Sequence, residues 1–566
     1  PRQPLAPPAL CHGTAGRLAA DGAHLDPLTP PDLVGLREAV RRAQPESVAV
    51  NLLFSYLDDG PERAIAAALP PGLFVTRSSE VLPVAGELER GVVTWLNARV
   101  GPLVGRYLER LGGGLPGARI AVMQSSGETI AARQATRHAV RLLLSGPAGG
   151  LAGAAFAASA GGAARLLSLD MGGTSTDVAV IDGEPRLTRS GRIAGLPVAL
   201  PMVDMQTIGA GGGSIARVDA GGLLLVGPES AGADPGPACY GRGGVASTVT
   251  DANLILGRLD PDSFLGGRLA LDRRAAAAAL APLAQTLGLS LEGAALGIVR
   301  LADEHMARAL RAITLERGLD PRGFTLTAFG GAGGLHACAL ADDLGIREAL
   351  VPVHAGVLSA LGMLVSPPGR TLTRSWITPL SALTEEGIEE GLERLARTGI
   401  EELVAEGRDP SELQVELGLD LRYQGQSYTL DLPWSGLAST ATAFHRAHAE
   451  AYGHRLQVQV ELVNLRARVR GAARLPVLPR VRLEGARAPR PVRRLAAYGC
   501  PEPVPVYPRE TLAGAFQVQG PAVVIDPVAT VWLGPGWWAH LDAVGNLRLR
   551  RDQTPSGVGG AGGLPV

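Results

Sequence analysis

The sequence predicts an α/β protein with more than one domain. Along the first two thirds of the chain, short apolar runs alternate with longer amphipathic runs, an order typical of strands followed by helices. Several of the predicted strands end in Gly-rich turns. The length of 566 residues is enough for two to four domains with their own apolar cores.

An N-terminal α/β domain is expected over residues 1–160, before a second one over residues 161–375. The predicted segments of the first domain are a helix at 31–42, a strand at 47–54, a helix at 62–69, a long helix at 87–111, a strand at 120–124 and a small-residue helix ending at 160. This alternation implies a parallel sheet. The last helix opens with Ser-Gly-Pro, which suits either an anion site at a helix N-terminus or a tight packing joint.

A strand–turn–strand segment at residues 166–181 is the centre of the second predicted domain. Two apolar runs, LLSL and VAVI, flank the sequence DMGGTSTD. Glycines let the backbone turn sharply and leave its N–H groups open to a ligand. Such N–H groups, together with hydroxyls, form a donor-rich concavity suited to phosphate oxygens. We therefore predict a phosphate-binding turn with donors from Gly172, Gly173, Thr174, Ser175 and Thr176.

A carboxylate stands at each end of this turn. Asp170 ends the first predicted strand, where a carboxylate can hold Mg²⁺ directly or through water. Asp177 lies in the second strand. We predict both as catalytic residues and Asp170 as the metal ligand.

Two further Gly-rich turns follow predicted strands, at residues 207–215 and after a strand at 325–329. A strand, a Gly-rich turn and a helix in this order let a nucleotide lie against the backbone. The candidate nucleotide contacts in these turns are Gly211, Gly212, Gly213, Gly330, Gly331, Ala332 and Gly333.

Two reactive side chains lie near these turns. Cys239 belongs to a long loop at 227–244 with little periodicity, and it is either a packed small residue or a nucleophile without an obvious His partner. His336 follows the last Gly-rich turn, where it could donate to a ligand or cap the helix.

Composition narrows the chemistry. All 53 basic residues are arginine, so a P-loop lysine and a lysine Schiff base are excluded. A net charge of −1 gives no support for a nucleic-acid partner, and no apolar run is long enough to cross a membrane. Four scattered cysteines suggest neither disulfides nor a zinc site, which fits a reducing cytoplasm.

The C-terminal third of the chain no longer shows the regular alternation of predicted strands and helices. We expect an α+β domain over 376–470, a Pro- and Arg-rich linker over 471–494, a small β unit over 495–552 and a disordered tail over 553–566.

The turn at 170–177 resembles the phosphate hairpin of the actin, sugar kinase and heat-shock ATPase fold. More narrowly, it resembles the second of two such hairpins in the hydantoinase A/5-oxoprolinase family. The resemblance covers roughly residues 2–551 and is carried by the runs VAVNLLFSY, SSEVLP, QSSG, LLSGPAGG, GAGGGSIA, VGPESAGADPGPACYG, TVTDAN and GGAGGLHA.

The resemblance implies a two-lobed actin-like ATPase with a C-terminal β-rich extension, using ATP and Mg²⁺. The implied activity is hydrolysis of a cyclic amide, of the hydantoin or 5-oxoproline type, after ATP activates its carbonyl. The implied partner is a hydantoinase B-type subunit. Two alternatives stay open: a subunit of an ATP-dependent ketone carboxylase, and a non-catalytic nucleotide-binding or scaffold subunit.

The sequence departs from the family pattern in two places. Ser126-Gly127-Glu128 stands where Asn-Gly-Gly is usual after Gln-Ser, and no first DxGGTxTD hairpin precedes Asp170. The resemblance therefore implies a first lobe without its opening strands. We expect the chain as given not to turn over ATP by itself, because catalysis needs the reacting atoms held from both sides.

Overall fold

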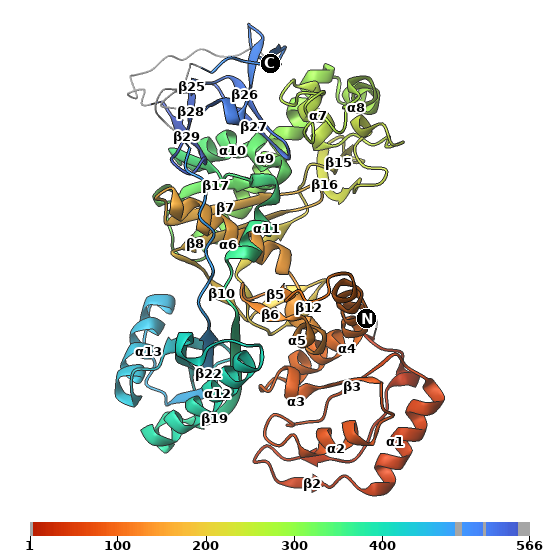
Figure 1. The fold of residues 1–566 in the computed structure, drawn as a ribbon, viewed down its shortest axis with the longest axis vertical. Helices are drawn as coiled ribbons and strands as arrows, with labels where there is room; N and C mark the ends of the chain where they lie inside the picture. The colour runs from red at the N-terminus through yellow and green to blue at the C-terminus, as the bar shows by residue number, and fades with distance from the viewer. Residues whose placement is uncertain (1–3, 482–488, 513–516, 553–566) are drawn as a thin grey trace. The chain divides into compact units, whose positions relative to one another are not determined.

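The computed structural model describes residues 4–481, 489–512 and 517–552 (Figure 1). It has the predicted mixed α/β composition and divides into two compact units. Unit 1 comprises residues 1–148, 187–203 and 366–474, and unit 2 comprises residues 149–186, 204–365 and 475–566.

The two units differ from the domains that the sequence predicted. Residues 376–470 belong to the same unit as the N-terminal segment, and residues 495–552 belong to the same unit as 204–365. Local sequence does not encode which distant strands will pair, so a grouping set by such pairing is not visible in a pass along the chain. The predicted tail at 553–566 and part of the predicted linker lie outside the described residues.

The N-terminal part of unit 1 contains the predicted strand–helix alternation. Its main elements are α1 (Pro30–Ala43), β3 (Ser47–Val50), α2 (Gly60–Ala68), β4 (Phe74–Arg77), α3 (Ser78–Val81), α4 (Glu87–Gly114), β5 (Ala121–Met123), β6 (Thr129–Ala131) and α5 (Ala132–Arg137). The strands β3 and β4 pair in parallel, as the alternation predicted. Gly101 of α4 lies against the Phe74 ring, where a Cβ would come within 2.1 Å, so this helix–strand contact requires glycine.

A four-stranded antiparallel sheet completes unit 1, in the order β19-β22-β20-β21. Its strands and helices are β19 (Gly369–Pro379), α12 (Glu385–Ala405), β20 (Gln414–Tyr423), β21 (Leu430–Pro433), α13 (Leu437–Tyr452) and β22 (Val460–Arg470). Apolar residues of the sheet and of both helices form a separate buried cluster around Tyr423 and Phe444.

Unit 2 is organised around a nine-stranded sheet with the path β14-β8-β7-β17-β18-β29-β28-β25, and β9 lies beside β8. Two short strands at its edges are β25 (Val518–Gln519) and β9 (Glu184–Pro185). Its central strands are β7 (Arg165–Met171), β8 (Thr176–Asp182), β14 (Met205–Ile208), β17 (Thr325–Phe329) and β18 (Glu348–Val351). The associated helices are α6 (Ser145–Ala160), α7 (Val249–Ile255), α8 (Arg273–Leu287), α9 (Leu291–Leu315), α10 (Gly330–Leu344) and α11 (Leu358–Val365). Within the sheet, β7, β17 and β18 run parallel and β8 runs antiparallel to β7.

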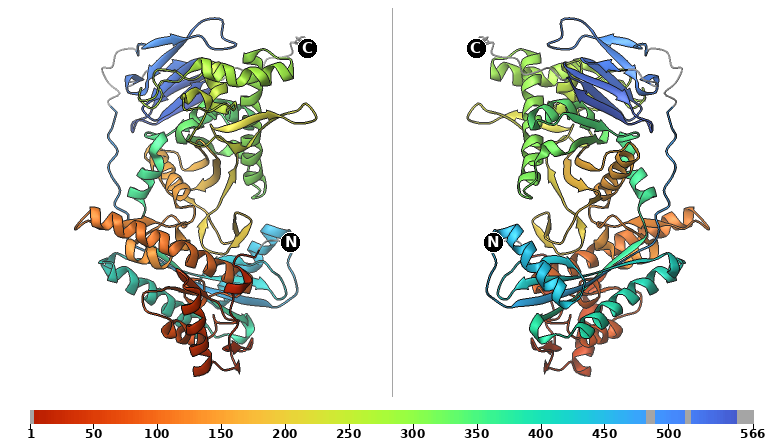
Figure 2. Two further views of the ribbon diagram at one scale, coloured as in Figure 1. Left: turned by 90° about the vertical axis from the view of Figure 1, so that its right-hand side faces the viewer. Right: turned by 90° about the vertical axis from the view of Figure 1, so that its left-hand side faces the viewer.

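The C-terminal strands do not form one small β unit. The strands β28 (Trp537–Leu541) and β29 (Leu547–Arg551) continue the large sheet, because β29 pairs antiparallel with β18. The strands β23 (Arg493–Leu495), β24 (Val504–Pro508), β26 (Ala522–Asp526) and β27 (Ala529–Leu533) form a second sheet. Figures 1 and 2 show these blue strands beside the green helix α10, and β27 contacts that helix.

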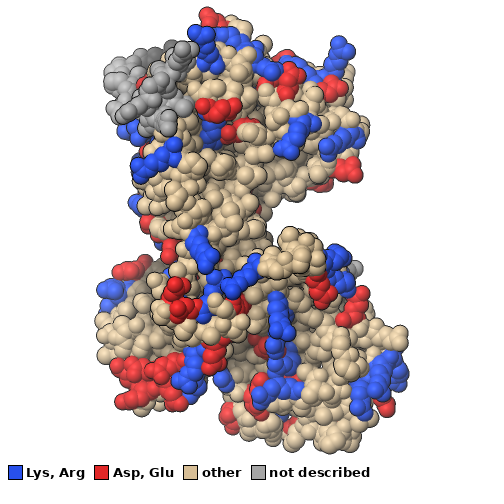
Figure 3. Space-filling model, in the orientation of Figure 1, with Lys and Arg blue, Asp and Glu red and all other residues tan. Residues whose placement is uncertain are grey.

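Neither the surface charge on the visible face (Figure 3) nor the hydropathy of the described helices points to a nucleic-acid-binding face or a single membrane-spanning helix. Figure 3 shows acidic and basic side chains interspersed on the visible face of the molecule. Among the described helices, none is by itself long and apolar enough to cross a bilayer, and α8 with α9 meets that test only as a pair bent by 89°.

Candidate functional site

The predicted phosphate turn joins β7 to β8 in unit 2. Both strands are buried along most of their length, because α9 and α10 pack against the sheet that contains them. This burial explains why the two runs are almost continuously apolar rather than alternating. The Gly172 N–H donates to the Ser175 carbonyl at 3.1 Å and closes the turn.

The tip of this turn offers unused hydrogen-bond donors. Gly173 and Thr174 are exposed and Ser175 is half-buried. Among the described residues, no group accepts a hydrogen bond from the backbone N–H of Gly173, Thr174 or Ser175, or from the two hydroxyls. These five donors are therefore available to an anionic ligand.

Thr176 is placed differently from the prediction. Its side chain is fully buried and its hydroxyl donates to the Ala210 carbonyl. The hydroxyl therefore ties the turn to the following Gly-rich loop instead of facing a ligand. The turn pattern alone does not tell which of its hydroxyl side chains belongs to the following strand and faces inward.

The loop at 209–214 supports the turn from behind. The Gly212 N–H donates to the Gly172 carbonyl at 3.0 Å, and the Gly213 N–H donates to the Gly173 carbonyl at 2.6 Å. The Gly211 N–H donates to the Ser214 hydroxyl at 2.8 Å. All three N–H groups predicted as phosphate donors are therefore already used inside the protein.

Glycine at position 211 is required by close backbone approach. A Cβ there would lie 2.7 Å from the Thr174 carbonyl carbon and 2.8 Å from the Ser175 nitrogen. Any larger residue would displace the tip of the turn. The loop therefore positions the predicted phosphate turn.

Asp170 lies in a recess lined by glycines. A Cβ on Gly330 would come within 2.6 Å of one Asp170 carboxylate oxygen, and a Cβ on Gly150 within 3.1 Å of the other. The Ser359 hydroxyl is 3.3 Å from the same Gly150 position. Among the described residues, no group donates a hydrogen bond to this half-buried carboxylate, so its hydrogen-bonding capacity is left for a cation or water.

The two acidic residues of the turn have different surroundings. Burial, together with the nearby charge of Asp177, raises the pKa of Asp170 to about 6. Burial also raises the pKa of Asp177, but the Thr207 hydroxyl, which donates to its Oδ1 at 2.5 Å, opposes that rise. Asp177 is thus bound within the protein, whereas Asp170 carries the unpaired and perturbed carboxyl group.

The start of α10 is next to Asp170. Its N-cap residue, Phe329, provides no side-chain cap, so the first N–H groups of the helix lack that partner. Gly330 has φ +78° and Gly331 is exposed. A Cβ built on Gly212 would lie 3.9 Å from the Cβ of Ala332. The second predicted nucleotide turn and the phosphate turn therefore meet in one place.

The other two reactive side chains lie in the interior. His336 is fully buried in α10 and its Nδ1 is 2.5 Å from Oδ1 of Asp303 in α9, so it neither caps the helix nor faces the turn. Cys239 is fully buried, and burial with the nearby Asp251 raises the pKa of its thiol, which agrees with a packed residue.

Sequence reasoning missed Gly150 and Ser359 as neighbours of Asp170. Gly150 lies in the run LLSGPAGG and Ser359 follows the strand β18, but their meeting depends on the packing of α6 against α11. Within the described residues no cluster of three or more His, Cys, Asp or Glu side chains could hold a metal. A cation here would have to take most of its ligands from water or phosphate.

The chain is similar to several known proteins. The model of the family described as Hydantoinase/oxoprolinase matches residues 90–369. An uncharacterised protein of Methanocaldococcus jannaschii is 36% identical, with 94% of this chain and 81% of that protein covered. Caprolactamase subunit alpha of Pseudomonas jessenii is 32% identical (97% and 82% covered), and 5-oxoprolinase 1 of Arabidopsis thaliana is also 32% identical (90% and 42% covered).

Two solved structures share the fold. The ATP-dependent caprolactamase from Pseudomonas jessenii superposes with a TM-score of 0.85 at 31% identity, covering 97% of this chain and 83% of that one. A nucleotide-free acetone carboxylase, from a study of ATP-dependent acetone carboxylation, gives a TM-score of 0.77 at 25% identity, covering 97% and 82%. Sequence and structure agree, and the chain belongs to the hydantoinase/oxoprolinase family.

Proposed function

We propose that this chain is the ATP-using subunit of a hydrolase that opens a cyclic amide. The observation that carries the proposal is the arrangement at the β7–β8 turn. Free N–H groups and hydroxyls of residues 173–175, the unbonded carboxylate of Asp170 and the uncapped start of α10 come together there. In an α/β unit, such a combination suits a nucleotide and its counter-ion.

The residues present fit Mg²⁺-ATP. The turn supplies donors for phosphate oxygens, and no side chain at Gly173 blocks the approach, since a Cβ there would meet nothing within 4 Å. Asp170 supplies one carboxylate group, and Mg²⁺ in proteins is usually held by one or two carboxylates while it keeps water and phosphate ligands. Mg²⁺ bound there would neutralise charge on the phosphates.

The chemistry proposed for ATP is activation of the amide carbonyl. Transfer of the γ-phosphoryl group to the amide oxygen releases ADP and leaves an electrophilic carbon. Water then attacks that carbon, the C–N bond breaks and phosphate leaves. The turn donors and the start of α10 would stabilise negative charge on the phosphoryl oxygens throughout.

Unit 2 is further proposed to be one lobe of an actin-like ATPase. The support is the antiparallel β7–β8 hairpin in a sheet that continues through parallel β17 and β18, with α10 leaving directly from a Gly-rich turn. The names of two relatives, caprolactamase subunit alpha and acetone carboxylase beta subunit, describe components of larger enzymes. We therefore also propose a hydantoinase B-type partner subunit.

A ketone carboxylase subunit is the second candidate. It is favoured by the acetone carboxylase fold match, in which the same ATP site would activate bicarbonate rather than an amide. Greater similarity to the caprolactamase places the hydrolase first. A non-catalytic nucleotide-binding subunit is the third candidate, and it would bind nucleotide without turnover.

Substrate-dependent phosphate release separates these candidates. The chain, together with a hydantoinase B-type subunit, would be given Mg²⁺-ATP with a hydantoin, 5-oxoproline, caprolactam, or acetone with bicarbonate. Stimulation by a cyclic amide, with equimolar ring-opened acid, is the expected result. Stimulation only by ketone and bicarbonate would replace the first candidate with the second. If calorimetry detects nucleotide binding but no substrate stimulates phosphate release, the non-catalytic nucleotide-binding subunit would be the remaining candidate.

A further inference from the structure

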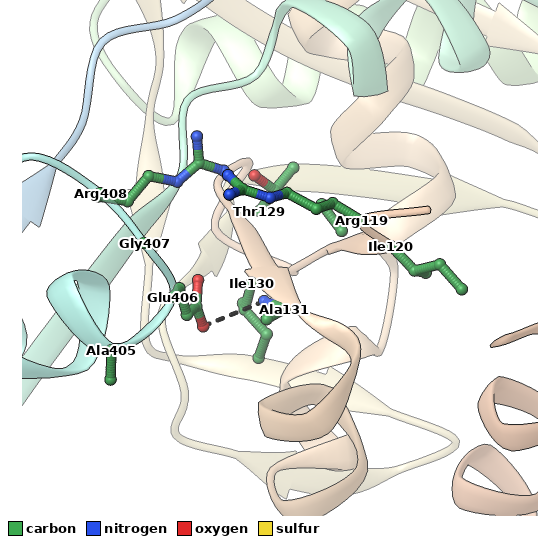
Figure 4. Close-up of a pocket in the computed structure, with 10 residues that line it drawn as sticks. Arg119, Ile120, Thr129, Ile130, Ala131, Ala405, Glu406, Gly407 and Arg408 are labelled. Atoms are coloured by element: carbon green, nitrogen blue, oxygen red, sulfur yellow. Dashed lines mark hydrogen bonds between the residues drawn. The ribbon is translucent and has the colours of Figure 1, made fainter. Parts of the chain in front are cut away.

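Unit 1 contains a pocket that the proposed ATP site does not use. It is an open cavity of about 390 Å³ between the end of α12 and the β5–β6 hairpin (Figure 4). This volume falls in the range of small-molecule sites. All of its lining residues belong to unit 1.

The end of α12 fixes one wall of the pocket. Gly407 has φ +80° and its N–H donates to the Val404 carbonyl at 2.8 Å, while the Arg408 N–H donates to the Leu403 carbonyl at 3.1 Å. This pair of bonds is the usual glycine-terminated end of a helix. It holds the backbone of Arg408 in a defined position at the pocket.

Two arginines face the cavity without acidic partners. Figure 4 shows the side chains of Arg119 and Arg408 extending toward one another. The Arg119 guanidinium passes over Gly407, where a built Cβ would be 3.7 Å from its Nη2. Among the described residues, neither guanidinium has an ion pair, and the buried Nε of Arg408 has no acceptor. A buried donor without a partner is unfavourable unless a ligand or water satisfies it.

The one acidic residue at the pocket is already neutralised. Glu406 accepts from the Ala131 N–H at 3.1 Å and forms an ion pair with the buried Arg370, which also binds Glu402 at 2.7 Å. Glu402 in turn lies near the buried Arg141. Two carboxylates are thus balanced by two other arginines, and the charges of Arg119 and Arg408 are left over.

The nearby helix end accounts for only part of this excess. A helix C-terminus carries the equivalent of about half a negative charge, and arginines often bind its last carbonyls. No described carbonyl accepts from either guanidinium, however. Two like charges directed at one another without such bonds favour an anion between them.

The rest of the lining is mostly aliphatic. It includes Ile120, Ile130 and Ala405, and the hydroxyl of the polar Thr129 donates to the Pro367 carbonyl at 3.4 Å. Apolar lining beside two guanidinium groups matches a ligand with a hydrocarbon chain and one carboxylate, rather than an inorganic anion. We propose that this pocket binds a small aliphatic carboxylate, with its carboxylate held by Arg119 and Arg408.

Calorimetric titration of the whole chain with hexanoate tests the proposal. Saturable binding of one hexanoate per chain is expected, with weaker binding of acetate and inorganic phosphate and none of hexanol. Arg408→Gln and Arg119→Gln should each weaken hexanoate binding by about tenfold or more, the effect of losing one charge-assisted hydrogen bond.

A matched control is Arg446→Gln. Arg446 is an exposed arginine on α13 that also lacks an ion pair among the described residues and does not line the pocket. The Arg446→Gln variant should bind hexanoate as tightly as the unchanged chain does. Arg119 is exposed, so its substitution should leave the fold intact, which thermal unfolding would check. No saturable hexanoate binding, equal loss in all three variants, or preference for phosphate would overturn the proposal.

Discussion

Asp170 and Asp177 are directly opposite one another across the β7–β8 hairpin, as paired residues of adjacent antiparallel strands. Side chains of such a pair lie on the same face of a sheet. Like charges opposite one another are unfavourable, which contributes to the raised pKa of Asp170. Their surroundings nevertheless separate the two groups, because Thr207 binds Asp177 while nothing described binds Asp170.

Asp170→Asn should reduce activity and increase stability. The amide keeps the shape of the carboxyl group but cannot hold a cation, so substrate-dependent ATP turnover of the complete enzyme should fall roughly 10²-fold or more. The same change removes a buried charge whose pKa is raised to about 6, so the free energy of unfolding at pH 8 should rise by roughly 1–3 kcal/mol.

The control for that change is Asp182→Asn at the other end of β8. Asp182 is exposed and its ion pair with Arg165 is 3.6 Å long, so both turnover and stability should stay nearly unchanged. Unaltered turnover in Asp170→Asn would show that the carboxyl group handles no cation.

Stability and ligand binding should depend on pH in opposite directions. The folded chain keeps a proton on Asp170 up to a pKa of about 6, against a usual value of 3.8, so it binds more protons than the unfolded chain between those values. The contribution of this group to stability therefore falls as pH rises from about 4 to 6. Binding of ADP with Mg²⁺ should instead weaken as pH falls through about 6, because the protonated carboxyl group cannot hold the cation. Calorimetry from pH 5 to 8 measures this, and the Mg²⁺-dependent part should vanish in Asp170→Asn.

Adjacent glycines at the start of α10 should respond differently to alanine. A Cβ at Gly330 would lie 2.3 Å from the Met171 carbonyl oxygen at a φ of +78°, so Gly330→Ala should lower the free energy of unfolding by more than about 1 kcal/mol. At Gly331 the nearest atom would be 3.7 Å away, so alanine there should be neutral or slightly stabilising. Denaturant unfolding of both variants tests this, and equal destabilisation would contradict it.

Those variants also report on the ligand. Because Gly331 is exposed at the predicted nucleotide turn, Gly331→Ala should weaken ADP binding without loss of stability. Unchanged affinity would mean that the nucleotide does not approach this part of the helix.

His336→Ala should affect stability and leave the Michaelis constant for ATP unchanged. The substitution leaves the buried Asp303 carboxylate without the histidine that is 2.5 Å away, at a cost of roughly 1–3 kcal/mol. Thermal unfolding and steady-state kinetics separate the two effects. A raised Michaelis constant for ATP with normal stability would instead indicate that His336 contacts the ligand.

The sequence by itself determined the local features of this site. The apolar runs around DMGGTSTD predicted β7, the turn and β8, and the strand before Gly330 predicted β17 and the start of α10. These elements depend on backbone freedom at glycine and on burial of neighbouring residues, both of which are visible in a short stretch of sequence.

Tertiary structure decided which groups meet. Only the packing of the 209–214 loop shows that the N–H groups of Gly212 and Gly213 donate to carbonyls of the turn. The same packing places the Thr176 hydroxyl against the Ala210 carbonyl. Likewise, β29 joins the large sheet through β18 although about 200 residues separate them in the chain. Pairing over such separations depends on the closure of long loops and the match of distant edges, so no local pattern determines it.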